Sequence, residues 1–280
     1  MTRPLSGPAP RLKLPEGTCD THMHFYGSQY PKHPGTTAAA PDASVEEYRQ
    51  LMSWLGISRT VVVQPNAYGY DNTCTMDGVA ALGLDKARAV VVVKPDVDDA
   101  ELERLTKAGA RGVRFMCQGP GHLKWDVMDE MVPRLRAIGW HPIVQFDGLE
   151  TPDHEAQLKR IQGDYVIDHI GKFLSPVTPD HEAFKSLLRL LDRGNCYIKL
   201  SAPYEAPWVS GPDYAGVTVL AKAIAKAAPE RLLWASNWPH PGQQNYPSDN
   251  GLLDLMTEWV PNESVRHKMF VENAARLYGF

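Results

Sequence analysis

The chain has 280 residues, with 29 Lys or Arg, 33 Asp or Glu and a formal net charge of −4 at pH 7. The basic residues are spread along the sequence, which argues against nucleic acid or an anionic membrane as a partner. The 4 cysteines are scattered without a CxxC pair, so we interpret them as reduced thiols of a cytoplasmic protein. The length suits one large α/β domain.

The N-terminal segment lacks the apolar core of a signal peptide, and no apolar run approaches the roughly 20 residues of a membrane span. Because this segment is rich in proline, we expect an extended arm over residues 1–16. Residues 17–280 are then expected to form a single domain.

Short β-branched runs alternate with amphipathic stretches along this domain. The expected strands are 17–24, 60–64, 88–93, 112–115, 142–146, 165–168, 196–200 and 232–235. The expected helices are 45–55, 98–108, 128–138, 179–191, 217–228 and 263–278, with a weaker helix within 71–85. Thr178 is the expected N-cap of the fourth of these helices, because Pro179 and acidic residues follow it.

Strands that alternate with helices pair in parallel through right-handed crossovers, and a series of this length closes into a barrel. The sequence therefore predicts an α/β fold, a (β/α)8 TIM barrel in a single domain. A doubly wound open sheet is the alternative, disfavoured because no glycine-rich phosphate loop follows the first expected strand.

Polar residues are concentrated where the expected strands end, which is where barrel enzymes place their active sites. They are His22, His24, Gln64, Asn66, Lys94, Arg114, Gln145, Asp147, Asp168, His169, Lys199, Ser201 and Asn237. The starts of the following helices account for some of these residues but not for the whole set.

Three histidines are the strongest catalytic candidates. His22 and His24 lie two apart on an extended segment, so both side chains point to the same side, whereas a lone strand histidine is more often a hydrogen-bonded core residue. His169 ends the sixth expected strand and is expected to face the same opening. Three imidazoles with an open position can bind Zn²⁺.

Asn237, at the end of the eighth expected strand, argues against that metal. A carboxylate there could ligate an ion and accept a proton from bound water, but a neutral amide is a poor ligand and a poor base. We therefore expect no metal and no other cofactor, with Asn237 as a fourth catalytic candidate.

The remaining candidates are expected to bind substrate. Arg114 suits a substrate carboxylate, with an ion pair to a neighbouring strand's Asp as the alternative. Lys199, with Tyr204 on the following loop, is expected to add an anion contact, although a strand lysine often pairs with Asp structurally. Gln64, Asn66 and Gln145 suit hydroxyl groups, and His240 lies on a loop expected to reach the same pocket.

Six stretches of the chain together resemble the amidohydrolase superfamily, in the branch of 2-pyrone-4,6-dicarboxylate lactonase and sugar-acid lactone enzymes. They are GTCDTHMHFYG, ARGVRFM, YVIDHIGKF, YIKLSAPYE, RLLWASNWPHP and ENAARLYGF, and the likeness runs from about residue 17 to the end. The lactonases of this branch have Asp where this chain has Asn237. The resemblance is greatest to members that interconvert six-membered and five-membered aldarolactones. Several enzymes of this branch act without a metal.

The resemblance implies a lactone isomerase that converts a 1,5-lactone to a 1,4-lactone by intramolecular acyl transfer. One imidazole would move the proton, and the other two, with Asn237, would stabilise the oxyanion. The alternatives are a lactonase in which another group activates water and a catalytically inactive barrel that binds sugar acids. The expected partner is a small carboxylated lactone, and the chain could form a homo-oligomer.

Overall fold

The computed structural model describes residues 3–36 and 40–280, which contain one parallel sheet of eight strands. The strands are β1 (Cys19–Met23), β2 (Arg59–Val63), β3 (Ala87–Val91), β4 (Ala110–Met116), β5 (His141–Gln145), β6 (Tyr165–Ile167), β7 (Cys196–Leu200) and β8 (Leu232–Trp234). Each strand pairs with the next along the chain, whereas a doubly wound sheet reverses its strand order. The (β/α)8 barrel is therefore confirmed.

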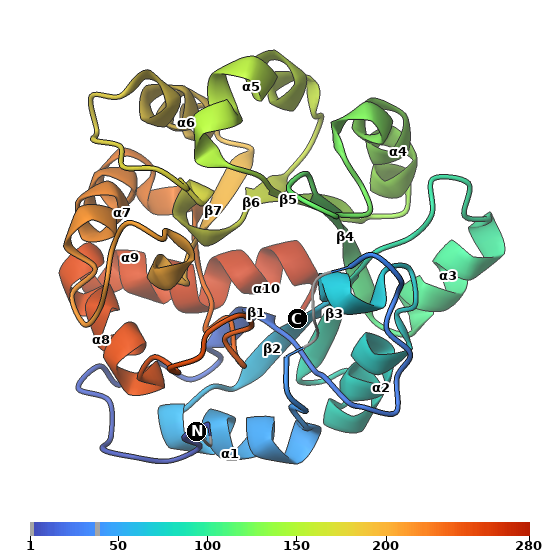
Figure 1. Cartoon of the computed structure of the whole chain (residues 1–280), viewed down its shortest axis with the longest axis horizontal. Coiled ribbons are helices and arrows are strands. Elements are labelled where there is room, and N and C mark those ends of the chain that lie inside the picture. The colour runs from blue at the N-terminus through green and yellow to red at the C-terminus, as the bar shows by residue number, and fades with distance from the viewer. Residues whose placement is uncertain (1–2, 37–39) are drawn as a thin grey trace.

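Helices surround the strands on the outside of the barrel (Figure 1). They are α1 (Val45–Leu55), α2 (Thr73–Leu82), α3 (Asp99–Lys107), α4 (Trp125–Ala137), α5 (Thr151–Arg160), α6 (Glu182–Asp192), α7 (Ala215–Ala227), α8 (Asp249–Trp259), α9 (Glu263–His267) and α10 (Asn273–Tyr278). Short 3-10 turns follow several strands, among them η1 (Asn66–Tyr68), η2 (Gly148–Glu150), η3 (His169–Gly171) and η4 (Pro203–Glu205), and η5 (Pro229–Arg231) precedes β8. No helix of the described part of the chain is long and apolar enough to cross a membrane.

Hydrogen bonds join β1 to β8 and to the loop that follows β8. They hold the first and last strands of the sheet together. Thr21 Oγ1 donates to the Trp234 carbonyl at 2.8 Å, and the Asn237 amide donates to the His22 carbonyl at 2.9 Å. The buried Asp20 carboxylate accepts from the Ser236 amide at 2.9 Å and from the Tyr48 hydroxyl at 2.8 Å. These bonds place the loop after β8 directly beside His22 of β1 and His24, which follows β1.

The barrel interior next to α10 is apolar, and α10 covers this end of it. Val61, Val90, Ile143, Val166 and Leu233 from the strands form one buried cluster with Leu277 and Tyr278 of α10. The Arg88 guanidinium near the start of β3 donates to the Tyr278 carbonyl at 3.1 Å, so α10 covers the N-terminal ends of the strands. The opposite end of the barrel, formed by the C-terminal ends of the strands and the loops after them, is open to a site. We call this end the mouth.

Three helix predictions need correction. The helix expected over 179–191 begins at Glu182, because His181 is the N-cap and its Nδ1 accepts from the Ala183 amide at 3.2 Å. The helix expected over 263–278 is divided into α9, a π-helical turn (Lys268–Glu272) and α10. The expected helices omitted α5 and α8, and α4 begins at Trp125 instead of residue 128.

The weaker helix expected within 71–85 is present as α2. In the segment expected to be an extended arm, residues 3–16 carry no helix or strand, and residues 1 and 2 lie outside the described residues. Leu5, Leu12 and Leu14 of this segment pack against the core, and the Leu12 amide donates to Asp254 at 2.9 Å.

Candidate active site

The three predicted catalytic histidines meet at the mouth. The ring centroid of His22 lies 4.8 Å from that of His24 and 4.7 Å from that of His169. All three are buried. His169 follows β6 with a φ of +49°, an unusual left-handed conformation for a residue with a side chain. The extended backbone of β6 therefore ends at His169, where its imidazole packs against that of His22.

The hydrogen bonds of His24 and His22 indicate which nitrogens carry protons. His24 Nδ1 lies 2.7 Å from the Val63 carbonyl, which only accepts, so we assign a proton to Nδ1 and a lone pair to Nε2. His22 Nε2, at 3.2 Å, then donates to His24 Nε2. His22 Nδ1 accepts from the Lys199 ammonium at 3.0 Å and also lies 3.2 Å from Asp168 Oδ1. Both rings are thus neutral and held by protein groups.

Burial is the main cause of this neutrality. It lowers the pKa of His24 to about 3 and the pKa of His169 to about 4. Burial, with the Lys199 ammonium, also places the pKa of His22 well below its ordinary value. At neutral pH the three rings are therefore hydrogen-bonding groups without charge and weak proton acceptors.

Asp168, beside His169 in the chain, connects the histidines to the two predicted cations. Its Oδ1 lies 3.0 Å from the Lys199 ammonium, and its Oδ2 lies 3.8 Å from Arg114 Nε. Although burial alone raises the pKa of Asp168, the Lys199 ammonium holds it well below its ordinary value. Asp168 is thus a buried carboxylate facing two buried cations, which leaves one formal positive charge in excess among the three residues.

Lys199 makes the contact expected of a strand lysine that pairs structurally with Asp, because its ammonium is fully buried against Asp168. Arg114 combines both alternatives. It donates to the Gln64 carbonyl at 3.0 Å and to Gln145 Oε1 at 2.6 Å, while its buried Nε has no hydrogen-bond partner among the described residues. The guanidinium is therefore held in place at the site by neutral groups and is only partly compensated by Asp168.

The three predicted amide side chains have different environments. The Gln64 carboxamide is engaged by the following loop, donating to the carbonyls of Gly69 and Asp71 and accepting from the Thr75 hydroxyl. It therefore anchors this loop, and its contact with substrate stays a prediction. The Gln145 carboxamide accepts from Arg114. Both polar atoms of the Asn66 side chain are buried without a partner in the described chain, which fits a group that meets a ligand.

Asn237 and the two loop candidates form a connected group at the same mouth. Asn237 Nδ2 donates to the Tyr204 hydroxyl at 3.0 Å, and this hydroxyl lies 2.7 Å from His240 Nδ1. His240 Nε2 lies 2.9 Å from Asp249 Oδ1, at the first residue of α8. His240 therefore contacts Tyr204 through one ring nitrogen and Asp249 through the other.

Sequence reasoning placed Asp168 at a strand end but not in the site, and it did not identify Asp20 or Asp249. The DH pair at 168–169 and the DTHMH run at 20–24 carried a signal, since a carboxylate next to a functional histidine often orients it. For Asp249 no signal exists, because an Asp at a helix start is explained by the helix dipole alone.

The donor set at the mouth does not fit a divalent metal. His22, Asp168 and His169 offer atoms within 4.8 Å of one another in the described residues. However, the Lys199 ammonium lies 3.0 Å from Asp168 and occupies the position of its counter-ion, with Arg114 as a second cation. A divalent ion among these groups would face two fixed like charges, and Asn237 provides an amide where a carboxylate ligand would compensate them.

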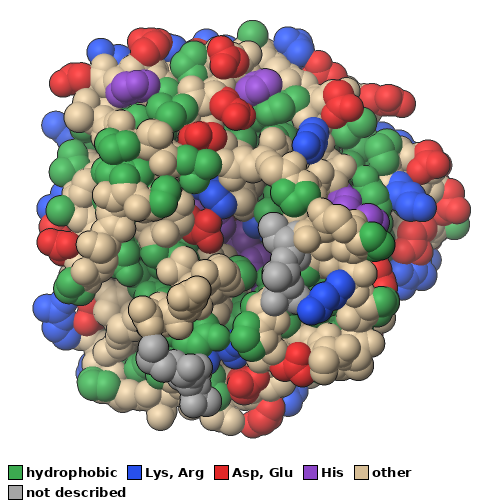
Figure 2. All heavy atoms as spheres, in the orientation of Figure 1, with side chains coloured by type: hydrophobic (Ala, Val, Ile, Leu, Met, Phe, Trp, Pro, Cys, Tyr) green, Lys and Arg blue, Asp and Glu red, His purple; other side chains and the backbone are tan. Residues whose placement is uncertain are grey.

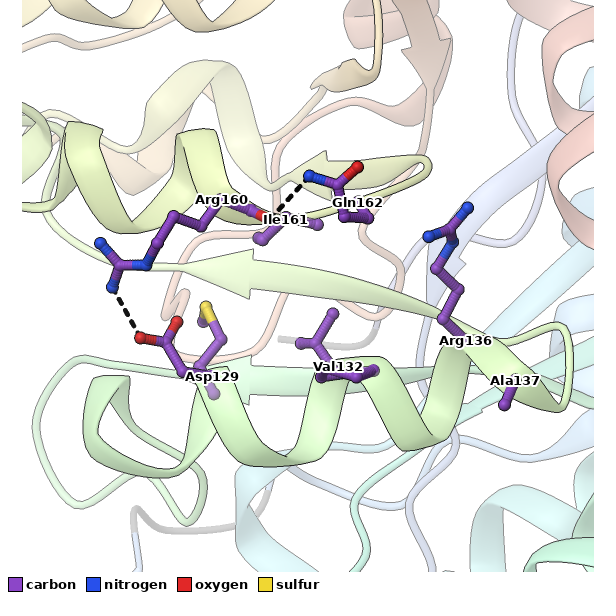
Figure 3. Close-up of a pocket in the computed structure, with 9 residues that line it drawn as sticks. Asp129, Val132, Arg136, Ala137, Arg160, Ile161 and Gln162 are labelled. Carbon is purple, nitrogen blue, oxygen red and sulfur yellow. Dashed lines mark hydrogen bonds and ion pairs between the residues drawn. The ribbon is translucent and has the colours of Figure 1, made fainter.

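Figure 2 shows histidine side chains inside a hollow of the visible face, with basic and acidic side chains beside it. A second depression lies outside the barrel between α4 and α5 (Figure 3). Val132 and Ile161 line it, and Arg160 pairs with Asp129 at 2.6 Å. Because residues 160–162 precede β6, this groove lies near the N-terminal ends of the strands, opposite the mouth. We therefore assign the candidate active site to the mouth.

The fold and this arrangement of strand-end residues are those of an amidohydrolase-type barrel. The amidohydrolase family model matches residues 19–280, and the chain belongs to this family. It is 39% identical to D-galactarolactone isomerase of Agrobacterium fabrum, with 99% of this chain and 96% of the relative covered. It is 32% identical to 2-pyrone-4,6-dicarboxylate hydrolase of Comamonas testosteroni, covering 96% of this chain and 92% of the relative. An apo crystal structure from Agrobacterium tumefaciens matches with a TM-score of 0.92 and 39% identity, covering 99% of both chains.

Proposed function

We propose that this protein isomerises sugar-acid lactones, converting an aldaro-1,5-lactone to the 1,4-lactone without a metal. The observation that carries the proposal is Asn237, a buried amide just after β8 whose backbone N–H donates to the His22 carbonyl at 2.9 Å and whose side chain donates to Tyr204 at 3.0 Å. The names of the similar proteins, an isomerase and a hydrolase of lactones, support an enzyme that acts on lactones. Asn237 favours isomerisation within that class, because hydrolysis needs a group that activates water.

The charge at the mouth supports a carboxylated substrate. Arg114 and Lys199 oppose a single carboxylate, Asp168, so a substrate carboxylate would supply the missing negative charge. The Arg114 guanidinium is fixed by Gln145 and the Gln64 carbonyl, which orients its donors in advance of binding. The Asn66 amide, which has no partner among the residues that the structure describes, is available to a substrate hydroxyl.

The reaction needs no external nucleophile. The substrate's own 4-hydroxyl attacks the lactone carbonyl carbon, forming a new C–O bond and a tetrahedral oxyanion. The bond from this carbon to the 5-oxygen then breaks, and the proton lost by the 4-hydroxyl is returned to the 5-oxygen. Holding the two reacting groups of one molecule together supplies much of the acceleration. The Asn237 amide, a neutral N–H donor, suits the developing oxyanion.

The test is to treat the purified protein with a chelator and incubate it with a panel of aldarolactones under NMR observation. We expect the 1,5-lactone signals to be replaced by those of the 1,4-lactone at the same rate before and after chelation. Open-chain acid as the enzymatic product would identify a lactonase, as the hydrolase relatives suggest. Binding without turnover would identify an inactive sugar-acid barrel, and activity restored only by stoichiometric Zn²⁺ would overturn metal independence.

A further inference from the structure

Four side chains from three separate segments form a continuous hydrogen-bonded chain at the mouth. Asn237 contacts Tyr204 at 3.0 Å, Tyr204 contacts His240 at 2.7 Å, and His240 contacts Asp249 at 2.9 Å. Asn237, His240 and Asp249 are buried, whereas Tyr204 is partly exposed. The chain therefore runs from a buried carboxylate to a phenol that a ligand can approach.

The chemistry of Asn237 sets the direction of these hydrogen bonds. Its amide nitrogen only donates, so the Tyr204 oxygen accepts this bond and the phenolic proton is directed to His240 Nδ1. His240 then carries its own proton on Nε2 and donates it to Asp249 Oδ1. An Asp at position 237 would instead attract the phenolic proton to itself. The amide thus leaves Tyr204 free to pass its proton to His240.

The backbone adopts an uncommon conformation to build this arrangement. Asn237 has a φ of +58° and His240 a φ of +60°, and the His240 amide donates to the Asn237 carbonyl at 2.8 Å. Left-handed backbone at a residue other than glycine costs on the order of 1 kcal/mol or more, and such residues cluster at functional sites. This turn places the amide and the imidazole on the same phenol.

The other candidate groups are poorly suited to accept a proton. Both His22 nitrogens and His24 Nδ1 are engaged in hydrogen bonds, and His24 Nε2 accepts one from His22. Burial lowers the pKa of His169 to about 4, which makes this ring a weak base. Asp168 is paired with Lys199. In the described site, the Tyr204 oxygen can accept a proton while its own proton passes to His240 Nδ1.

We propose that Tyr204 is the catalytic residue that carries the proton between the two substrate oxygens, and that His240 and Asp249 are its positioning residues. This inference rests on the proposed isomerisation. As the 4-hydroxyl attacks, its proton passes to the Tyr204 oxygen while the phenolic proton passes to His240 Nδ1, giving an imidazolium that Asp249 stabilises. When the bond to the 5-oxygen breaks, Tyr204 protonates that oxygen and recovers its own proton from His240.

The surroundings of Tyr204 make this transfer concerted. Burial and the neighbouring carboxylates of Glu205 and Asp249 raise the pKa of Tyr204 well above its ordinary value, with Tyr214 as a further titratable neighbour. Glu205 is itself paired with Lys172 at 2.7 Å. A free phenolate would therefore not accumulate at neutral pH, and the proton must enter the phenol as another leaves it for His240.

The first test compares Tyr204→Phe with Tyr70→Phe in the full chain. Tyr70 is a control because its hydroxyl donates to a backbone carbonyl, that of His122. We expect Tyr204→Phe to lower kcat for lactone isomerisation by about 100-fold or more, the range of general acid–base catalysis, with KM changed by less than about threefold. Tyr70→Phe should stay within about twofold of the wild type. Tyr204→Phe with more than about a third of wild-type kcat would overturn the proposal.

The second test uses His240→Gln and Asp249→Asn, with kcat measured against pH and binding of an open-chain aldarate as a check of the folded site. We expect kcat to fall by about 10- to 100-fold while aldarate affinity stays within about threefold, and the pH profile of kcat to change shape in both variants. Variants that lose affinity and keep kcat, with an unchanged pH profile, would assign a purely structural role and reject the relay. An inactive wild type would instead refute the proposed isomerisation, so the two failures are distinguishable.

Discussion

The Lys199 ammonium of β7 lies 3.0 Å from the carboxylate of Asp168, which directly follows β6, and both groups are fully buried. Removing one partner of such a pair leaves the other charged and unsolvated. We expect Lys199→Met to lower the free energy of unfolding by about 3–5 kcal/mol. Urea denaturation measures this loss.

The half-exposed pair of Lys268 and Glu230, at 2.7 Å, provides a matched control. Lys268→Met should cost less than about 1 kcal/mol, because solvent screens an exposed ion pair. The double variant Lys199→Met with Asp168→Asn should recover part of the stability lost by the single change. A loss below about 1 kcal/mol for Lys199→Met would show that Asp168 does not depend on this ammonium.

Arg114 is expected to bind the substrate carboxylate. Arg114→Met should weaken the binding of carboxylated lactones by about 2–4 kcal/mol, which is about 30- to 1000-fold in affinity. Arg111→Met is a control on the same strand, since Arg111 contacts the carbonyls of Thr106 and Ala110 outside the site. Titration calorimetry with an aldarate measures the effect. Equal affinities for the two variants would move Arg114 to a structural role.

Asn237→Asp tests whether the neutral amide suppresses hydrolysis. The substitution keeps the shape of the side chain and adds a base at the mouth, so the ratio of open-chain acid to isomerised lactone should rise. NMR at saturating substrate gives this ratio for both proteins. An ionised carboxylate also repels the substrate's carboxylate, so affinity should fall. Identical product ratios would mean that Asn237 does not separate isomerisation from hydrolysis.

Acid should destabilise the fold through its buried histidines. Burial lowers the pKa of His141 to about 3, as it does for His24, and lowers that of His169 to about 4. The unfolded chain, with histidine pKa values of about 6.5, then binds more protons than the folded chain between about pH 6.5 and about pH 4. The free energy of unfolding therefore falls as the pH drops through this window, while Asp20, whose pKa burial raises, opposes the trend.

His141→Gln isolates one contribution, because His141 lies at the start of β5 and outside the site. Each such histidine contributes up to about 1.4 kcal/mol per pH unit to the slope of stability against pH. The variant should therefore lose less stability than the wild type between about pH 6.5 and about pH 4.5 in urea denaturation. Equal slopes would contradict a neutral buried His141 in the folded state.

The fold was predictable because its signals are local. Strand and helix periodicities recur within windows of a few residues, and their alternation selects a parallel barrel. The helix boundary at His181 was not, because Thr178 and Pro179 form an equally good local start and the actual cap depends on how α6 packs.

The sequence by itself determined that polar groups gather where the strands end, and that an amide stands at position 237. Only the tertiary structure decided which groups touch: Lys199 on Asp168 and Asp249 behind His240. Those pairings join residues from separate strands and helices, so neither spacing nor residue type reveals them. Burial at the mouth then sets the charges of these groups, because a water-poor site keeps the three imidazoles neutral beside one excess positive charge.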